Sequence, residues 1–468
     1  MKITKYILML SVGLFLSSCE DYLDVNVNPN GATRPPLRGL LANATYNTGD
    51  NVYTLGSTTS FYTQYLASPN QASPVDVYDR VSTSGTWGSL YDIMGDIYDM
   101  KRFASESNSF HYMGVANVLL AINLGMVADS YGDAPYSEAL DFQTIVPKYD
   151  SQEQLYGVIQ TLLDEGIVNL NRANEGEPLP RANDFIHEGN VKAWVKTAYL
   201  LKARYLNHLS KTASYDASAV LAAVSQAYTS NADDAQITQF QQRNPWAQVA
   251  LNNANLFLGG WISEQFIDAL NGKTFGVVDP RLSKITNPLP SGNFVGTANG
   301  AGRTGDGAGA QTAVYLTTNG FYSSTNSPLI IASYSESKFI EAEAAFRTGN
   351  KDRAYTAYLE GIGSNHDKVG VAAADKATFA SSTAIAVGAD KLTLQNIFDQ
   401  KYVAIFLHPE AWVDARRFDY KYKDFTVPEN SLLDGQFIRR LDYPDTERTR
   451  NSGNIPNVTL TTPLFWDK

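Results

Sequence analysis

The chain has 468 residues, a formal net charge of −11 and a single cysteine, Cys19. The acidic balance argues against nucleic acid as a partner, because phosphate binding needs clustered Lys and Arg. One cysteine excludes a disulfide within the chain and a zinc site built on thiolates, and the length is sufficient for a large apolar core.

Residues 1–18 have the layout of a cleaved secretory signal. Lys2 and Lys5 precede a mostly apolar run, which is too short to span a bilayer, and small residues follow it. The order Leu-Ser-Ser-Cys at 16–19 is similar to a bacterial lipobox, in which the cysteine receives lipid after the signal is cut. We therefore expect Cys19 to carry a covalent lipid, since two or more acyl chains anchor a protein stably. The alternative is an ordinary signal peptide followed by an incidental cysteine.

Residues 19–39 are rich in Asn, Asp, Pro and Gly, and this composition predicts a flexible tether between the lipid and the folded body. Helices are expected beyond it. An apolar stripe at helical spacing predicts a helix over 87–103, and the segment 111–128 is apolar nearly all round, which predicts a central helix. Ser151 and Gln154 match a capping box at the start of a further helix.

Two helix pairs are expected in the later part of the chain. The first joins a helix beginning at Val191 to a short helix over 217–228, which Asp216 caps. The second joins residues 335–350 to residues 351–362, with Gly349 at the end of the first helix. Small and aromatic residues at these offsets resemble the packing of tetratricopeptide repeats, although the full consensus is absent.

Residues 279–328 differ in composition from the helical segments, with eight glycines between 292 and 320 and several Pro and Asn turns. This composition predicts a loop-rich region with short strands, and loops of this length are uncommon unless they are functional or disordered. Gly300, Gly302 and Gly305 formally match a dinucleotide-binding fingerprint. The required strand before it and helix after it are missing, so we do not interpret it as a nucleotide site.

We expect neither catalytic residues nor a metal. The five histidines are scattered, and neither an H-E-x-x-H nor a G-x-S-x-G motif occurs. Glu341 and Glu343 lie two residues apart on an expected helix and therefore point to different sides, as acids of a packing network do. A glycosidase needs only two carboxylates in space, so the sequence alone does not exclude one.

The ligand site is expected on two loops, residues 70–80 and 291–322. Both loops are polar and carry aromatic residues that no helical stripe explains. Aromatic rings among polar side chains suit a sugar ring and suit a peptide almost as well, although each ring can instead pin its loop to the body. The candidate binding residues are Asn70, Gln71, Tyr78, Arg80, Phe294, Tyr315, Phe321 and Tyr322.

Eight segments of the chain, in order, resemble the SusD/RagB family of nutrient-binding outer-membrane lipoproteins of the Bacteroidetes. They are CEDYLDVNVNPN (19–30), DSYGDAPYSEAL (129–140), VKAWVKTAYLLKARYLNHLS (191–210), DPRL (279–282), SKFIEAEAAFRTGN (337–350), QKYVAIFLHPEAWVDARRFDY (400–420), RRLDYPDTERTRN (439–451) and PLFWDK (463–468).

The resemblance implies a mostly α, SusD-like fold with tetratricopeptide-like helix pairs, forming one domain over 40–468 with the loop-rich insertion at about 279–328. It implies a non-catalytic, surface-exposed lipoprotein of the outer membrane that binds an oligosaccharide or peptide. The protein would act as the lid of a SusC-like TonB-dependent transporter. The alternatives are a surface glycan hydrolase and an adhesin.

The resemblance also implies roles for single residues. Glu20 and Asp21 resemble the acidic export signal that directs such lipoproteins to the cell surface. Within HPEAWVDARRF, we expect Trp412 to pack in the core and Arg416 and Arg417 to pair with acids. No cofactor is expected apart from the lipid on Cys19.

Overall fold

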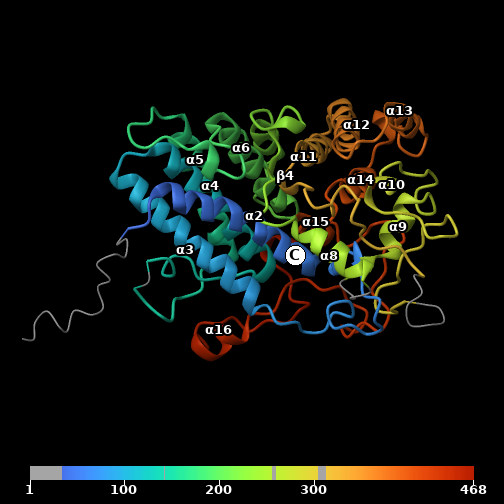
Figure 1. Cartoon of the computed structure of the whole chain (residues 1–468), viewed down its shortest axis with the longest axis horizontal. Helices are drawn as coiled ribbons and strands as arrows, with labels where there is room; N and C mark the ends of the chain where they lie inside the picture. Colours follow the sequence, from blue (N-terminus) through green and yellow to red (C-terminus); the bar gives the residue numbers. More distant parts are fainter. Residues whose placement is uncertain (1–33, 142, 256–259, 304–311) are drawn as a thin grey trace, which may run out of the picture.

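The computed structural model describes residues 34–141, 143–255, 260–303 and 312–468. The expected signal peptide and most of the expected tether lie outside the described residues, as do the expected lipid and export residues Cys19, Glu20 and Asp21. Helices dominate, which confirms the mostly α class (Figure 1). The α-helices are α2 (Leu37–Tyr62), α3 (Ser84–Glu106), α4 (Phe110–Tyr131), α5 (Gln152–Asn171), α6 (Val191–His208), α7 (Ala217–Val224), α8 (Pro245–Ala254), α9 (Glu264–Leu270), α10 (Leu282–Ile285), α11 (Tyr334–Arg347), α12 (Lys351–Lys368), α13 (Ala373–Ser381), α14 (Leu394–Ala404), α15 (Glu410–Arg417) and α16 (Asp445–Arg450).

The strands are short and form two antiparallel pairs. β1 (Leu66–Ala67) pairs with β3 (Trp261–Ile262), and β2 (Ala235–Ile237) pairs with β4 (Leu329–Ala332). Each pair joins segments that are far apart in the sequence. The strands therefore act as clasps between distant parts of the helical body.

α4 is the central helix of the first half, as its apolar sequence predicts. It packs against α2, α3, α5 and α6, and nearly all its side chains are buried. Among the described residues it is the one helix long and apolar enough to cross a membrane, but 89% of that apolar window is buried inside the molecule. A helix that is apolar all round is explained by burial on every side in a protein core.

The two expected helix pairs are present. α6 packs against α7, and α11 packs against α12, which follows it after Gly349 with φ +79°. A side chain at Gly361 of α12 would place its Cβ 2.9 Å from the ring of Phe339 on α11, so a small residue admits a bulky neighbour there. This arrangement is the tetratricopeptide-like packing that the sequence predicts.

The predicted caps of two helices are confirmed, but the second of these helices, α7, is shorter than predicted. Ser151 and Gln154 form the capping box of α5, and the carboxylate of Asp216 accepts the first backbone N–H groups of α7. α7 ends at Val224 rather than at Tyr228. The hydroxyl of Ser225 donates to the carbonyls of Leu221 and Ala222, and such bonds compete with continuation of the helix.

α2 corrects the predicted extent of the tether. The helix begins at Leu37, inside the stretch 19–39 that was expected to be flexible, and it follows Pro36 in an extended conformation. Leu37, Leu40, Leu41 and Ala44 are buried on one face of this helix. Their helical spacing, i, i+3, i+4 and i+7, explains why the segment is ordered despite the Pro and Gly residues around it.

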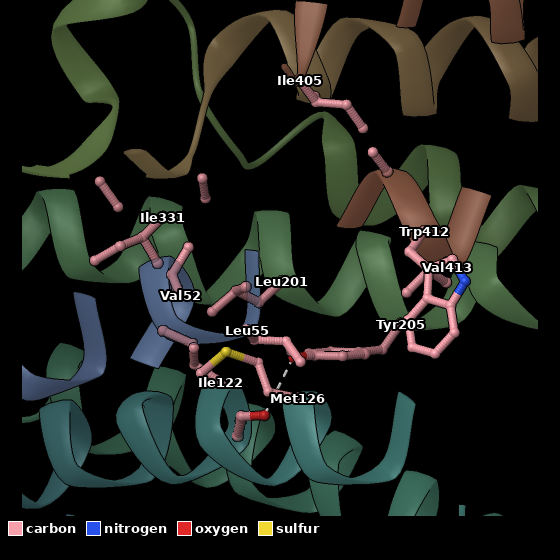
Figure 2. Close-up of a cluster of buried hydrophobic side chains, with 14 of the residues drawn as sticks. Val52, Leu55, Ile122, Met126, Leu201, Tyr205, Ile331, Ile405, Trp412 and Val413 are labelled. Atoms are coloured by element: carbon pink, nitrogen blue, oxygen red, sulfur yellow. Dashed lines mark hydrogen bonds between the residues drawn. The ribbon is translucent and has the colours of Figure 1, made fainter. Parts of the chain in front are cut away.

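One hydrophobic core joins both halves of the chain (Figure 2). Figure 2 shows Val52 of α2, Met126 of α4 and Tyr205 of α6 beside Ile331 of β4 and Trp412 of α15. Trp412 has only 1% of its surface exposed, which confirms its expected packing role. Residues more than 350 positions apart in the sequence therefore share one interior.

The predicted arginine pairs are half confirmed. Arg417 binds both carboxylate oxygens of Glu343, at 2.9 and 2.8 Å, and one of Asp414 at 2.8 Å. For Arg416 the expectation is wrong, because its guanidinium donates to backbone carbonyls, including Asp129 at 2.7 Å, and lies 3.7 Å from the centre of the Trp412 ring. The last carbonyls of a helix lack partners within the helix, and Arg416 satisfies one of them at the end of α4.

Glu341 and Glu343 lie on different faces of α11, as predicted. Glu343 is buried with Arg417, whereas Glu341 pairs with Lys338 at 3.0 Å and Arg353 at 2.8 Å. Both acids belong to the packing network between helices.

Candidate functional site

The candidate site is a bundle of three loops, residues 68–80, 296–303 and 424–435, which we call the loop bundle. Asp76 lies at its centre and is fully buried. Its carboxylate accepts the backbone N–H groups of Ser68 and Gly300, both at 2.9 Å, and the side-chain amide of Asn299 at 2.6 Å. One carboxylate therefore joins the first loop to the second.

Burial raises the pKa of Asp76 to about 6, although the three hydrogen bonds act in the opposite direction. Asn299 extends the connection to the strands: its amide donates to the carbonyl of Leu66 in β1, and its oxygen accepts the hydroxyl of Ser263 after β3. The loop bundle is thus fastened to the β1–β3 clasp and does not project freely from the body.

Two glycines bring the loops into backbone contact. At Gly300, with φ +78°, a Cβ atom would lie 1.8 Å from the carbonyl oxygen of Glu429, and at Gly302 one would lie 2.5 Å from the backbone nitrogen of Gln71. These two positions admit only glycine because backbone atoms occupy the space of a side chain. The glycines of the formal dinucleotide fingerprint are therefore explained by loop packing, while Gly305 lies outside the described residues.

Residues of the first predicted loop divide into exposed and buried positions. Asn70 and Gln71 are exposed on the loop bundle. Arg80 is exposed too, but its guanidinium forms ion pairs with Asp442 and Asp445, which fasten the end of the loop to α16.

Tyr78 does not face solvent, contrary to its proposed role in binding. It is fully buried, with its ring edge-to-face against Tyr62 at 5.8 Å between ring centres. Its φ of +61° is uncommon for a bulky residue and turns the chain at this point so that the ring enters the core.

Residues of the second predicted loop also divide. Phe294 and Phe321 are half-buried and pack against the core with part of each ring accessible, and Tyr315 is half-buried beside Trp261, with 5.7 Å between ring centres. Tyr322 is only 6% exposed and lies edge-on to Phe406, so a ligand cannot reach it in this conformation. The rings of Tyr78 and Tyr322 pin their loops, which was the alternative explanation for these aromatics.

The β1–β3 clasp connects the two predicted loops. Trp261 of β3 pairs with Tyr315 in an antiparallel bridge, and Ser263 pairs with Thr297 in a parallel bridge. Ala72 donates its backbone N–H to the carbonyl of Gly300 at 3.3 Å, and Arg303 donates to the carbonyl of Pro69 at 3.0 Å. Asn70 and Gln71 therefore lie next to the segment 300–303.

A polar cavity of about 310 Å³ adjoins the loop bundle, and the sequence analysis did not anticipate its residues. It lies between the start of α9 and the third loop, and its lining includes Gln265, Asp268, Lys273, Asp424 and Glu429. The turn-rich sequence of 424–435 was the available signal. The cavity offers amide, carboxylate and ammonium groups as hydrogen-bonding partners for a ligand.

The most strongly perturbed acids and bases lie away from the loop bundle, inside the core. His208 contacts the hydroxyl of Tyr156 at 2.8 Å and a carboxylate oxygen of Glu410 at 2.6 Å. Burial lowers the pKa of His208 to about 3 and raises that of Glu410 to about 7. The adjoining cavity has a volume of only about 30 Å³, which admits water but not a sugar ring. The hydrogen bonds of this network satisfy polar groups that burial removes from water.

In the described part of the chain, no group of three or more His, Cys, Asp or Glu side chains is placed to hold a metal ion.

Comparison with known families and structures identifies many similar proteins. The SusD-like family model described as starch-binding and associating with the outer membrane matches residues 29–444. No curated protein sequence matches the chain significantly.

The solved structures that match cover nearly the whole fold. A SusD/RagB family protein from Bacteroides thetaiotaomicron is 22% identical with a TM-score of 0.73, and the match covers 92% of this chain and 99% of that chain. A chitin-binding SusD homologue from Flavobacterium johnsoniae is 20% identical with a TM-score of 0.75, and the match covers 92% and 98% of the two chains. At this level of identity the structures establish the SusD-like fold.

Proposed function

Because the chain belongs to the SusD-like family, we propose that it is a non-catalytic cell-surface protein that binds oligosaccharides for uptake through a SusC-like TonB-dependent transporter. The observation that carries this proposal is the loop bundle. It holds three polar loops in one fixed arrangement with the amides of Asn70 and Gln71 exposed, and the half-buried rings of Phe294, Tyr315 and Phe321 lie on the predicted loop 291–322, which contains its second segment. Such a surface binds by hydrogen bonding and stacking and requires no reacting group.

We place the ligand on the accessible members of the predicted set. Asn70 and Gln71 supply amide donors and acceptors, while Phe294, Tyr315 and Phe321 supply partly exposed rings. Arg80 is engaged by two carboxylates and has the lesser role of holding the loop in place. Tyr78 and Tyr322 are excluded from direct contact by their burial.

We favour an oligosaccharide over a peptide as the ligand for two reasons. The family description names starch binding, and a structural neighbour of the same fold is chitin-binding. Amides and aromatic rings serve both ligand classes, so the choice rests on these relatives and not on the side chains alone.

Binding without turnover is favoured over hydrolysis by where the perturbed groups lie. A general acid must reach the glycosidic oxygen, yet His208 is only 1% exposed and the cavity that Glu410 lines is too small for a sugar. The accessible acids near the cavity of the loop bundle include Asp268, which already pairs with Lys273 at 2.6 Å.

The proposed attachment is a covalent lipid on Cys19, with Glu20 and Asp21 as the signal for transport to the cell surface. The proposed partner is a transporter barrel that the protein covers as a lid. An interface for that role should exceed the roughly 1,200–2,000 Å² of a standard association.

The test is a glycan and peptide array probed with the purified protein in detergent, followed by calorimetry with the best ligand. Replacing Asn70, Gln71 and Phe294 together with Ala should weaken binding about 100-fold, since two hydrogen bonds and one stacked ring contribute roughly 1 kcal/mol each. Tyr78→Phe is the matched control, because it changes the same loop but keeps the buried ring, and it should bind normally.

Intact affinity in the triple variant would move the site elsewhere. Binding of peptides alone would replace the ligand class. Release of shorter sugars from the bound oligosaccharide would favour the surface hydrolase.

A further inference from the structure

A second hollowed surface lies on the other part of α2, where that helix packs against α3. One open hollow of about 500 Å³ lies there, a second of about 530 Å³ lies where α2 adjoins residues 185 and 239–241, and Asn43 and Asn47 line both. We call them together the α2–α3 groove. Asn47 lies 15 residues before the end of α2, which is about 22 Å along the helix axis, and none of the residues that line the two hollows belongs to the loop bundle.

The side chains of one hollow have the composition of a carbohydrate site. Tyr46 and Phe185 are half-buried and meet edge-to-face, with 5.8 Å between ring centres. Phe240, also half-buried, lines the same hollow between the exposed amides of Gln239 and Gln241. Aromatic faces beside amides can stack on the C–H face of a sugar while hydrogen-bonding its hydroxyl groups.

The other hollow is kept open by glycines of α3. Gly85 and Gly88 line it, and a Cβ atom added at either position would meet nothing within 4 Å. Glycine destabilises a helix relative to alanine, and no neighbouring atom here requires its small size. The open space at both positions instead keeps the floor of the groove free of side chains.

Side-chain hydrogen bonds connect the asparagines of the groove to a carboxylate. Asn47 donates its amide to the side-chain oxygen of Asn43, and Asn43 donates to a carboxylate oxygen of Asp96, both at 2.6 Å. Asp92 lines the same hollow. Among the described residues that line the two hollows there is no Lys or Arg, so the field in the groove repels anions.

From these observations we propose that the α2–α3 groove is a second oligosaccharide-binding site, which accepts neutral and amino sugars and rejects acidic ones. This inference rests on the proposed function, since it assigns the same class of ligand to a separate surface. Stacking on the three rings would hold the sugar, the asparagines would orient it, and Asp92 with Asp96 would favour an ammonium group over a carboxylate.

The test uses calorimetry at pH 6 with three probes: chitohexaose, its fully deacetylated hexamer and hexagalacturonate. Gly88→Gln fills the groove from a position where the helix has room for a side chain. It should reduce binding of the first two probes at least tenfold at one of two sites, leaving the other site unchanged. Gly157→Gln on α5 is the matched control, because Gly157 also has open space at its Cβ but lies outside the groove, and it should bind as the wild type does.

The predicted preference of the groove among sugars of different charge is tested by comparing their affinities. Hexagalacturonate should bind the groove at least tenfold more weakly than chitohexaose, and Asp92→Asn should reduce the preference for the deacetylated hexamer. Equal affinity and stoichiometry for wild type and Gly88→Gln would overturn the groove while leaving the proposed function in place. Loss of all binding in the variant with Asn70, Gln71 and Phe294 replaced by Ala would also overturn the groove and leave the proposed function in place. If the wild type binds neither chitohexaose nor its deacetylated form, the groove proposal fails, and the array alone then decides the proposed function.

Discussion

The raised pKa of Asp76 makes the stability of the folded protein depend on pH. Its folded-state pKa of about 6 lies above the usual 3.8, so the folded protein holds this proton more tightly than the unfolded chain does. The resulting contribution to stability is present below pH 4 and is lost as the pH rises through 6, by up to about 3 kcal/mol. Asp76→Asn removes this dependence. We therefore expect the wild type to lose stability relative to the variant between pH 4 and 7 in urea unfolding, and a constant difference would contradict the assignment.

Arg417 and Arg80 contrast a buried with an exposed ion pair. Arg417, Glu343 and Asp414 have side chains at most 2% exposed. Arg417→Ala removes the partner that the two buried carboxylates share and leaves Glu343 with Arg347 and Asp414 with Lys401, so it should cost about 3 kcal/mol. The side chain of Arg80 is 44% exposed, and Arg80→Ala should cost about 0–1 kcal/mol. Chemical denaturation of both variants measures the two free energies. Similar losses would show that burial does not determine the value of these pairs.

At the scale of elements, glycines mark where helices approach each other most closely. A Cβ atom at Gly125 of α4 would lie 2.0 Å from the buried hydroxyl oxygen of Tyr205 on α6, so Gly125→Ala should destabilise the protein by about 1–3 kcal/mol. Gly157→Ala on α5 meets open space and should stabilise by about 0.5–1 kcal/mol through helix propensity alone. Thermal unfolding of both variants gives the two signs, and a stabilising Gly125→Ala would refute this packing of α4 on α6.

For the whole molecule, the proposed lipid on Cys19 determines location. Cys19→Ala should leave the chain unacylated and release it from the outer membrane, which fractionation and fatty-acid labelling measure. The matched variant replaces Glu20 and Asp21 with neutral residues. Its acylation should persist, while its accessibility to protease at the cell surface should fall. Retention and labelling of the Cys19→Ala protein would exclude the lipobox interpretation, and unchanged accessibility would exclude the export role of Glu20 and Asp21.

The proposed lid also predicts an assembly. Purification from outer membranes in mild detergent should yield the protein together with a barrel of transporter size, because a large interface survives such conditions. Isolation only as a free monomer would count against the lid and in favour of the adhesin.

The sequence by itself determined what depends on neighbouring residues along the chain. Helical periodicity located α3 and α4, and the Ser151 capping box and the Asp216 cap marked two helix starts, because these interactions span at most a few turns. The residue pattern also indicated the two helix pairs, and the resemblance added the family. Periodicity was also present at the start of α2, where the Pro and Gly residues around it led to the prediction of a tether.

Only the tertiary structure decided which loop residues face solvent. Tyr78 and Phe294 both lie in polar, turn-rich sequence, yet one ring is enclosed beside Tyr62 and the other keeps an accessible edge. That difference arises from contacts between residues more than 100 positions apart: Asp76 binds Gly300, and Gly300 touches Glu429. The α2–α3 groove has the same origin, since Asp96 lines one hollow beside Asn43 and Phe240 lines the other only when helices and a distant loop pack together. Burial is a property of the assembled surfaces, and no local pattern encodes it for a residue outside a regular helix or strand.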